Sequence, residues 1–279
     1  MKNKLLKTLA CFGGIFTIGS TIAITSTSCG CSAEEKINPL PENVYDIDET
    51  THELKGFTSE FLANPSAYDM CDTMRIPTEV MGIASEAFYN HLFKITLIPK
   101  FIKKVTFAKG SMLTSLNNNS FQKSEFTQID FSNCNNLISF TGVGCFTDSK
   151  LTSVKFPKNL KEIGAFAFCQ CSSLTSITLP SGLETIEDNA FRLSSSLVSV
   201  KFPSSLTKIG SDVFCGCLLD NIEWNAWTGN TTLDATSFSN VPQKGTVKVI
   251  NPTDDEHNSA KLLEYLKTNG GLPSTWNAA

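Results

Sequence analysis

The sequence has few histidines and lacks the motifs by which most catalytic and metal sites are recognised. No G-x-S-x-G, H-E-x-x-H, Walker or dinucleotide fingerprint is present. The stretch Asp46-Ile-Asp48 begins like a calcium loop, but Thr51 and Phe57 stand where that loop needs glycine and glutamate. The histidines are few and widely spread: His52, His91 and His257. We therefore predict neither an enzyme nor a bound metal or cofactor.

An excess of positive charge is also missing. The chain has 23 Lys and Arg against 27 Asp and Glu, and its pI is about 5.5. Because acidic residues outnumber basic ones, the composition does not indicate a nucleic-acid-binding protein, and we exclude nucleic acid as a partner. With 279 residues, 41% of them hydrophobic, the chain is long enough to bury a substantial core.

A hydrophobic run of the ~20 residues that a membrane span requires is absent as well. Instead, the N-terminus places Lys2, Lys4 and Lys7 before a short apolar run, Leu9 to Ile24, which glycines interrupt. This layout predicts a secretory signal peptide over residues 1–28 and hence an exported protein.

The end of this signal, Ser26-Thr-Ser-Cys29-Gly30, resembles a bacterial lipobox, although Ser26 replaces the usual leucine. The resemblance implies that a lipid on Cys29 anchors the mature chain to the outer face of the cell membrane. Two alternatives stay open: lipidation of Cys31, or cleavage without a lipid.

Residues 29–72 differ in composition from the repetitive remainder of the chain. Ten acidic residues but only two basic ones lie between Ala33 and Asp72, and Pro39 and Pro41 favour an extended chain. Apolar residues then return at near-helical spacing, at Leu54, Phe57, Phe61 and Leu62. We predict the lipid attachment site, an acidic spacer and a short N-terminal cap in this segment.

What the chain has in abundance is an internal repeat. Pro157, Pro180 and Pro203 are 23 residues apart, and each closes an alternating run such as Val154-Lys-Phe156. Alternation of period two is typical of a strand, and the proline ends that strand. Similar triplets recur upstream and downstream, so we predict a stack of about seven units over residues 73–250, with an insertion or irregular unit between Asn90 and Gly110.

The second half of each unit is equally regular. It repeats a Leu, an Ile and a Phe, as in Leu183, Ile186 and Phe191. Its short length and glycine content favour irregular or 3-10 arcs over long helices. The predicted fold is therefore an α/β repeat solenoid with a ~23-residue period, a parallel sheet on one face and an irregular second face.

The phrase LTSITLPSGLETIEDNAF, Leu174 to Phe191, with neighbours ending AFCQC and VFCGC, resembles the BspA-like leucine-rich repeats of bacteria. The likeness is strong over residues 151–217 and weaker over 74–238. The cysteine of the family phrase matches Cys171 and Cys217, whereas Ser194 and Ser149 replace it elsewhere. The resemblance implies a secreted or surface-attached protein for binding or adhesion, without an active site.

Residues 251–279 lie outside the repeat. Asn258-Ser259 is a capping signal for a helix through Leu262 and Leu266 that closes at Gly270. Because a solenoid must cover its last unit, we predict a C-terminal helical cap here.

The paired cysteines Cys169/Cys171 and Cys215/Cys217 look like zinc ligands. They lie two units apart, however, or ~9–10 Å at strand spacing, whereas zinc holds each sulfur at ~2.3 Å. We therefore interpret them as small apolar residues that fill a column of turns.

The remaining candidate site is the outward surface of the sheet, where the middle residue of each strand triplet and some neighbours form a ribbon of hydroxyls and alternating charges. We predict that it binds a surface protein or glycan of a host or neighbouring cell; the alternative is a structural or decoy coat protein that binds nothing specific. We expect Trp224 to point into the core and Trp227 to be exposed near the end of this surface. The predicted binding residues are Thr106, Asp130, Ser153, Lys155, Ser176, Thr178, Ser199, Lys201, Glu223 and Lys248.

Overall fold

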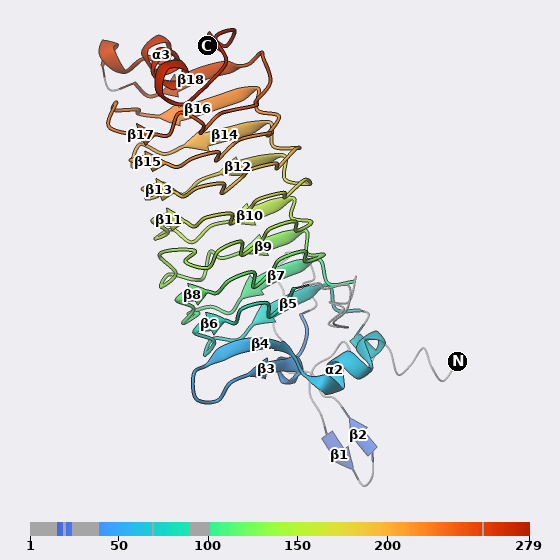
Figure 1. Ribbon diagram of the computed structural model, residues 1–279. Helices are drawn as coiled ribbons and strands as arrows, with labels where there is room; N and C mark the ends of the chain where they lie inside the picture. Colours follow the sequence, from blue (N-terminus) through green and yellow to red (C-terminus); the bar gives the residue numbers. More distant parts are fainter. Residues whose placement is uncertain (1–15, 19–20, 24–38, 69, 90–100, 253) are drawn as a thin grey trace, which may run out of the picture.

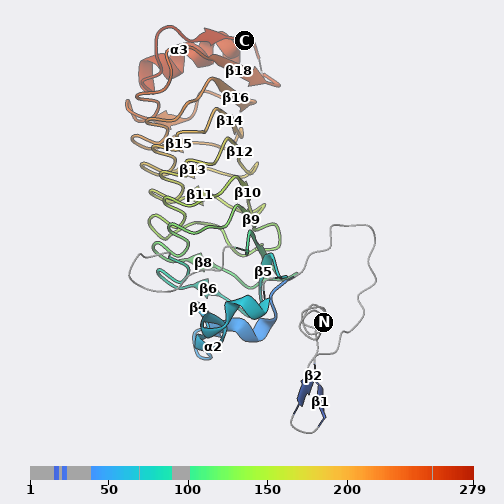
Figure 2. The same cartoon turned by 90° about the vertical axis from the view of Figure 1, so that its right-hand side faces the viewer.

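The computed structural model describes residues 16–18, 21–23, 39–68, 70–89, 101–252 and 254–279. Repeated turns of chain stack on one another into an elongated solenoid, with α3 (Ser259–Asn269) covering its C-terminal end (Figures 1 and 2). The prediction of a repeat solenoid with a parallel sheet on one face is confirmed. A short antiparallel pair, β1 (Phe16–Ile18) and β2 (Thr21–Ala23), lies within the predicted signal segment. The predicted lipidation site, Cys29, lies outside the described residues.

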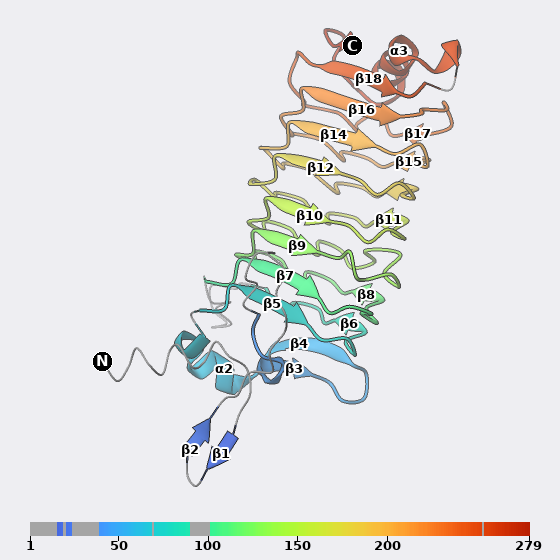
Figure 3. The same cartoon turned by 180° about the vertical axis from the view of Figure 1, so that it is seen from behind.

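One face of the solenoid carries a long parallel strand from each turn (Figure 3). The offset between paired residues is 23 for Ser176 and Ser199 and 25 for Asn221 and Thr246. The long strands are β5 (Thr73–Ile76), β7 (Lys104–Phe107), β9 (Gln128–Asp130), β10 (Ser153–Lys155), β12 (Ser176–Thr178), β14 (Ser199–Phe202), β16 (Asn221–Asn225) and β18 (Thr246–Ile250).

The ladder of long strands is interrupted once. One sheet has the order β10-β9-β7-β5, and a second begins at β12 and continues through β14, β16 and β18 to β19 (Asn277–Ala278). Val154 and Phe156, beside the interruption, are half-buried, whereas their counterparts Val200 and Phe202 are buried. Looser packing of β10 therefore accompanies the break.

The turn between β5 and β7 is longer than the others. Thr73 pairs with Lys104, an offset of 31 residues. The predicted insertion between Asn90 and Gly110 overlaps this turn, but its last residues include the regular strand β7. Residues 90–100 lie outside the described residues.

The second face differs in detail from the expected irregular arc, because most turns contribute a two-residue strand to it. The turn that follows β9 contributes only Ser139, in an isolated bridge with Glu162. The two residues are enough to form parallel ladders, since Ile163, Ile186 and Ile209 point inward in register. Turns rather than helices fill the rest of this half of the unit. The short strands are β6 (Gly82–Ile83), β8 (Ser115–Leu116), β11 (Glu162–Ile163), β13 (Thr185–Ile186), β15 (Lys208–Ile209) and β17 (Thr232–Leu233).

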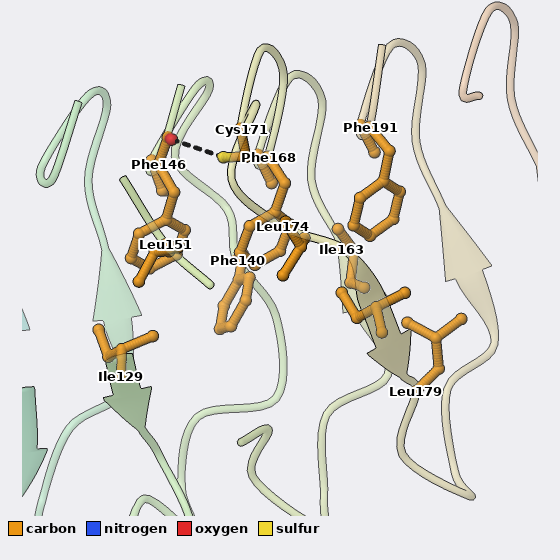
Figure 4. Close-up of a cluster of buried hydrophobic side chains, with 14 of the residues drawn as sticks. Ile129, Phe140, Phe146, Leu151, Ile163, Phe168, Cys171, Leu174, Leu179 and Phe191 are labelled. Carbon is orange, nitrogen blue, oxygen red and sulfur yellow. Dashed lines mark hydrogen bonds between the residues drawn. The ribbon is translucent and has the colours of Figure 1, made fainter. Parts of the chain in front are cut away.

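A single column of stacked phenylalanine rings, the aromatic column, runs through the core along the described turns. Neighbouring ring centroids lie 5.1 to 5.5 Å apart with interplanar angles of 1° to 16°. Each ring is at most 1% exposed, and Figure 4 shows three of them in a row. The column comprises Phe88, Phe121, Phe146, Phe168, Phe191, Phe214 and Phe238.

Tight turns around the aromatic column contain residues in the left-handed region. Asn119, Asn189 and Asp212 occupy one such position, as expected for side chains that tolerate it. Phe166 occupies the same position with φ 56°, and its ring is 38% exposed. A bulky left-handed residue is strained, because Cβ approaches the following carbonyl oxygen.

The N-terminal cap is a β-hairpin followed by a short helix. β3 (Tyr45–Ile47) pairs antiparallel with β4 (Glu53–Phe57), which joins the short-strand ladder through β6. The helix α2 (Ser59–Ala63) comes next, with Phe61 buried, and short 3-10 turns span Glu42–Val44 and Pro65–Tyr68. The near-helical spacing that begins at Leu54 therefore belongs partly to a strand.

The C-terminal cap combines a 3-10 turn (Asp255–His257), α3 and β19. The Asn258 side chain accepts hydrogen bonds from the backbone N–H groups of Ala260 and Lys261, as an N-cap does. The side chains of Leu262 and Leu266 in α3 are fully buried, and Trp276 fills the space beside Gly245. The cap thereby removes the apolar end of the solenoid from water.

Candidate functional site

The candidate site is the outward surface of β5 to β18, which we call the sheet face. Two columns of side chains point outward from it, because alternate residues of each strand face opposite sides. In one of these columns, Thr178, Lys201, Glu223 and Lys248 follow one another in register on successive strands. The structure thus brings the residues proposed from the sequence onto one surface.

The predicted residues differ in exposure. Ser153, Lys155, Ser176, Thr178, Lys201 and Lys248 are exposed, whereas Asp130, Ser199, Glu223 and Thr106 are half-buried. The hydroxyl of Thr106 is covered and has no hydrogen-bond partner, so this residue offers no polar contact at the surface.

The sequence pattern missed the first strand of the face. Arg75 in β5 is exposed and aligns with Thr106, and Lys104 in β7 stands half-buried in the neighbouring column. The signal was present, since Thr73-Met-Arg-Ile-Pro77 has the same strand-proline form as the later units. The 31-residue offset concealed it.

Two ion pairs join charged residues of adjacent strands on the sheet face. Lys155 Nζ lies 3.1 Å from Asp130 Oδ2, and Lys201 Nζ lies 3.9 Å from Glu223 Oε2. Burial would raise the pKa of Asp130, but hydrogen bonds from Ser132 and the charge of Lys155 outweigh it and lower the pKa. Asp130 therefore carries a negative charge at neutral pH, so that charges of both signs lie along the face.

Trp227 is not exposed, contrary to expectation, because the C-terminal cap covers it. The side chain is 4% exposed, and its ring centroid lies 5.7 Å from that of His257 and 5.5 Å from that of Tyr265. A shallow cavity of about 380 Å³ adjoins these residues, away from the sheet face. Trp224, in contrast, lies in the core as expected, at 1% exposure.

The second cysteine of each of the phrases AFCQC and VFCGC belongs to a buried column of small residues: Ser149, Cys171, Ser194 and Cys217. Each of the last three donates to the carbonyl of the aromatic-column residue one turn earlier. Cys171 Sγ lies 3.1 Å from the Phe146 oxygen (Figure 4), and Ser194 Oγ lies 2.7 Å from that of Phe168. Serine and cysteine alternate here because both fill a small site and supply one hydrogen.

The thiols of this column are held protonated. Burial raises the pKa of Cys171 and of Cys217 to about 12. Among the described residues, no three His, Cys, Asp or Glu side chains gather closely enough to hold a metal ion. The contacts of the cysteines are those of packing residues.

In the part of the chain that the structure describes, no helix has the length and apolar character needed to cross a bilayer.

Comparison with known proteins gives a family match and several structural likenesses. Residues 64–142 and 114–244 match the family described as the BspA type leucine rich repeat region, in six copies. No functionally curated protein shows significant similarity to the chain.

The solved structures similar to this chain include three bacterial proteins. A leucine-rich repeat protein from Bacteroides ovatus is 19% identical, with 75% of this chain and 70% of that chain aligned and a TM-score of 0.44. The leucine-rich repeat protein of T. pallidum is 18% identical over 86% of this chain and 100% of its own, with a TM-score of 0.42. The pneumococcal vaccine antigen PcpA is 12% identical over 96% and 90%, with a TM-score of 0.31.

Proposed function

Because this chain belongs to the BspA-type leucine-rich repeat family, we propose that it is a bacterial cell-surface protein that binds a protein or glycan of a host or neighbouring cell. The binding surface in this proposal is the sheet face, and the activity is adhesion rather than catalysis. A lipid on Cys29 would hold the exported chain at the outer face of the membrane, as its N-terminal sequence suggests.

The observation that carries the proposal is the register of the sheet face. Strand pairing holds the outward side chains in straight columns, so that Lys201 lies directly between Thr178 and Glu223. A surface of this kind is long, rigid and already ordered. Binding to it therefore avoids much of the free-energy cost of ordering side chains and loops, which weakens association elsewhere. Solenoids commonly bind through such extended surfaces.

The test of the sheet face is a combined substitution on neighbouring exposed strands. Lys155→Gln/Thr178→Ala/Lys201→Gln removes three polar contacts without touching the core. We expect attachment of the purified protein to host cells to fall severalfold, while far-UV circular dichroism and melting temperature stay unchanged. Unchanged attachment would contradict the proposal and leave the role of a non-binding coat protein.

The lipid anchor is tested separately. Radiolabelled palmitate should enter the protein in its native host and be lost in Cys29→Ser, with Cys31→Ser as the matched control. Loss of label only in the Cys31 variant would move the lipid to that residue. Absence of label in the parent protein would remove the anchor from the proposal but leave the sheet face in place.

A further inference from the structure

We infer that the ligand of the sheet face is a linear acidic polysaccharide with about one negative charge per disaccharide. This inference rests on the proposed function, because it assigns a chemical class to the ligand of the same surface. It derives from the sign, spacing and composition of the outward columns.

The sheet face is positive on a chain that is negative overall. Among the outward residues of β5 to β18, five are basic and two are acidic, Asp130 and Glu223, whereas the whole chain has a formal charge of −4. The basic residues are Arg75, Lys104, Lys155, Lys201 and Lys248.

The opposite face has the reverse sign. Along β11 to β17, with the residue on either side of each strand, Lys161 and Lys208 are outnumbered by acidic residues, and each is paired to one of them, at 2.7 and 2.9 Å. The acidic residues are Glu162, Glu184, Glu187 and Asp234. An anionic ligand is therefore attracted to one face and repelled by the other.

The lysines of the sheet face recur on alternate turns. Lys155, Lys201 and Lys248 are each separated by two turns, or ~9.6 Å at the strand spacing, which is about the length of an extended disaccharide. The stack of turns continues across the interruption between β10 and β12, because Phe168 and Phe191 keep a ring separation of 5.3 Å there. A linear polymer lying along the solenoid axis would meet one cation per disaccharide.

The carboxylates one turn away from the lysines select for a ligand of low charge density. Glu223 stands between Lys201 and Lys248, and Asp130 lies beside Lys155. A polymer with a charge on every residue, such as a nucleic acid, would place anions against these carboxylates. A polymer charged once per disaccharide places a neutral sugar there instead.

The existing ion pairs do not prevent exchange with a ligand. The Lys155 side chain is 73% exposed, and the Lys201–Glu223 pair is loose at 3.9 Å. The lysine of each pair stays exposed to solvent although its carboxylate partner is half-buried, and ion pairs that solvent reaches contribute only ~0–1 kcal/mol. A ligand anion can therefore replace or join the protein carboxylate at each lysine.

The composition of the face favours a glycan over a protein. The cores of protein interfaces are enriched in Tyr, Trp, Phe, Met and Arg, and depleted in Lys and Ser. The outward positions of β5 to β18 hold no aromatic residue, and the hydroxyl-bearing Ser176, Thr178 and Ser199 lie beside or between the lysines. Hydroxyl groups of this kind hydrogen-bond to sugar hydroxyls, while the lysines supply the attraction for charge.

The experiment measures binding of the full mature protein to immobilised hyaluronan, which carries one carboxylate per disaccharide. Dextran serves as the neutral polymer, and heparin and duplex DNA serve as densely charged ones. We expect hyaluronan to bind at ~0.01 M salt and to weaken strongly by ~0.15 M. Dextran should not bind, and heparin and DNA should bind less well per unit charge.

The matched variants test the two faces. Lys155→Gln/Lys201→Gln/Lys248→Gln should weaken hyaluronan binding at least about tenfold, since three exposed charge contacts are lost. The control Lys161→Gln/Lys208→Gln removes two exposed lysines from the opposite face and should leave binding unchanged. Equal losses in both variants would overturn the inference.

Two further outcomes separate the inference from the proposed function. If the sheet-face variants lose cell attachment but the parent protein does not bind hyaluronan, an acidic polysaccharide is excluded as the ligand and the adhesive role remains. If DNA or heparin binds more tightly than hyaluronan and depends on the same lysines, the assigned spacing of one ligand charge per disaccharide is wrong.

Discussion

The aromatic column offers the sharpest test of how the solenoid is held together, through the substitution Phe191→Ala. Phe191 is completely buried, and its ring stacks on Phe168 at 5.3 Å and on Phe214 at 5.5 Å, almost parallel to both. Replacing a buried phenylalanine with alanine costs ~3–5 kcal/mol, because both transfer energy and packing are lost. That is a large part of the ~5–15 kcal/mol by which a typical domain is stable.

The position of Phe191 in the middle of the stack adds a second consequence. Each turn contacts only its neighbours, so a defect there weakens the coupling between the two halves of the solenoid. All three tryptophans lie in the C-terminal half, so fluorescence reports on that half, while circular dichroism reports on the whole chain. We expect the two urea-unfolding curves to coincide in the parent protein and to separate in Phe191→Ala.

Phe166→Ala is the matched control, since it makes the same change one turn earlier at an exposed site. It should alter the free energy of unfolding by no more than ~0.5 kcal/mol. Phe191→Leu retains most of the volume and should lose ~1–1.5 kcal/mol, mainly from the two stacked contacts. A loss below ~1 kcal/mol in Phe191→Ala, or a loss no larger than in Phe166→Ala, would refute the role given to the column.

Three other predictions concern single features of the fold. Ser194→Ala should cost ~1–3 kcal/mol in chemical unfolding, because the Phe168 carbonyl and the Cys171 N–H lose a buried partner, and Ser194→Cys should restore most of that loss. Burial raises the pKa of Cys171 to about 12, so as the pH rises above ~9 the thiol of the unfolded chain loses its proton before that of the folded chain. The free energy of unfolding should therefore fall by up to ~1.4 kcal/mol per pH unit from this group. In unfolding measured from about pH 9 to 11, Cys171→Ser should show a shallower decline. Phe166→Gly should raise the melting temperature, because relief of left-handed strain of ~1–2 kcal/mol exceeds the entropy that glycine adds to the unfolded chain, whereas a lower melting temperature would contradict that strain.

The parts of the fold that the sequence predicts are those with strict spacing. Pro157, Pro180 and Pro203 mark the strand ends, and in each case the proline carbonyl accepts from the N–H three residues later, as a turn requires. The aromatic column results from the same spacing, since equal intervals place Phe168 and Phe191 at equivalent points of successive turns.

The parts that the sequence does not predict depend on short elements or distant contacts. A two-residue strand such as Thr185–Ile186 is too short to show an alternating pattern in the sequence. The ladder of short strands on the second face therefore cannot be predicted without the stacked structure. Trp227 is buried because His257 and Tyr265, far along the chain, pack against it. The face residues were placed by alternation alone, but the pairing of Lys155 with Asp130 depends on side-chain rotamers.

The interchangeability of successive turns has a consequence for how such a gene can vary. Removal of residues 175–197 would join Leu174 to Val198, which reproduces the junction that Leu197 already makes. Phe214 would then meet Phe168 in place of Phe191, and Cys217 would donate to the carbonyl of Phe168 as it now does to that of Phe191. Recombination between the similar DNA segments that encode these units therefore shortens or lengthens the particle by whole steps while preserving the remaining contacts, so that lineages can differ in reach without any change in architecture.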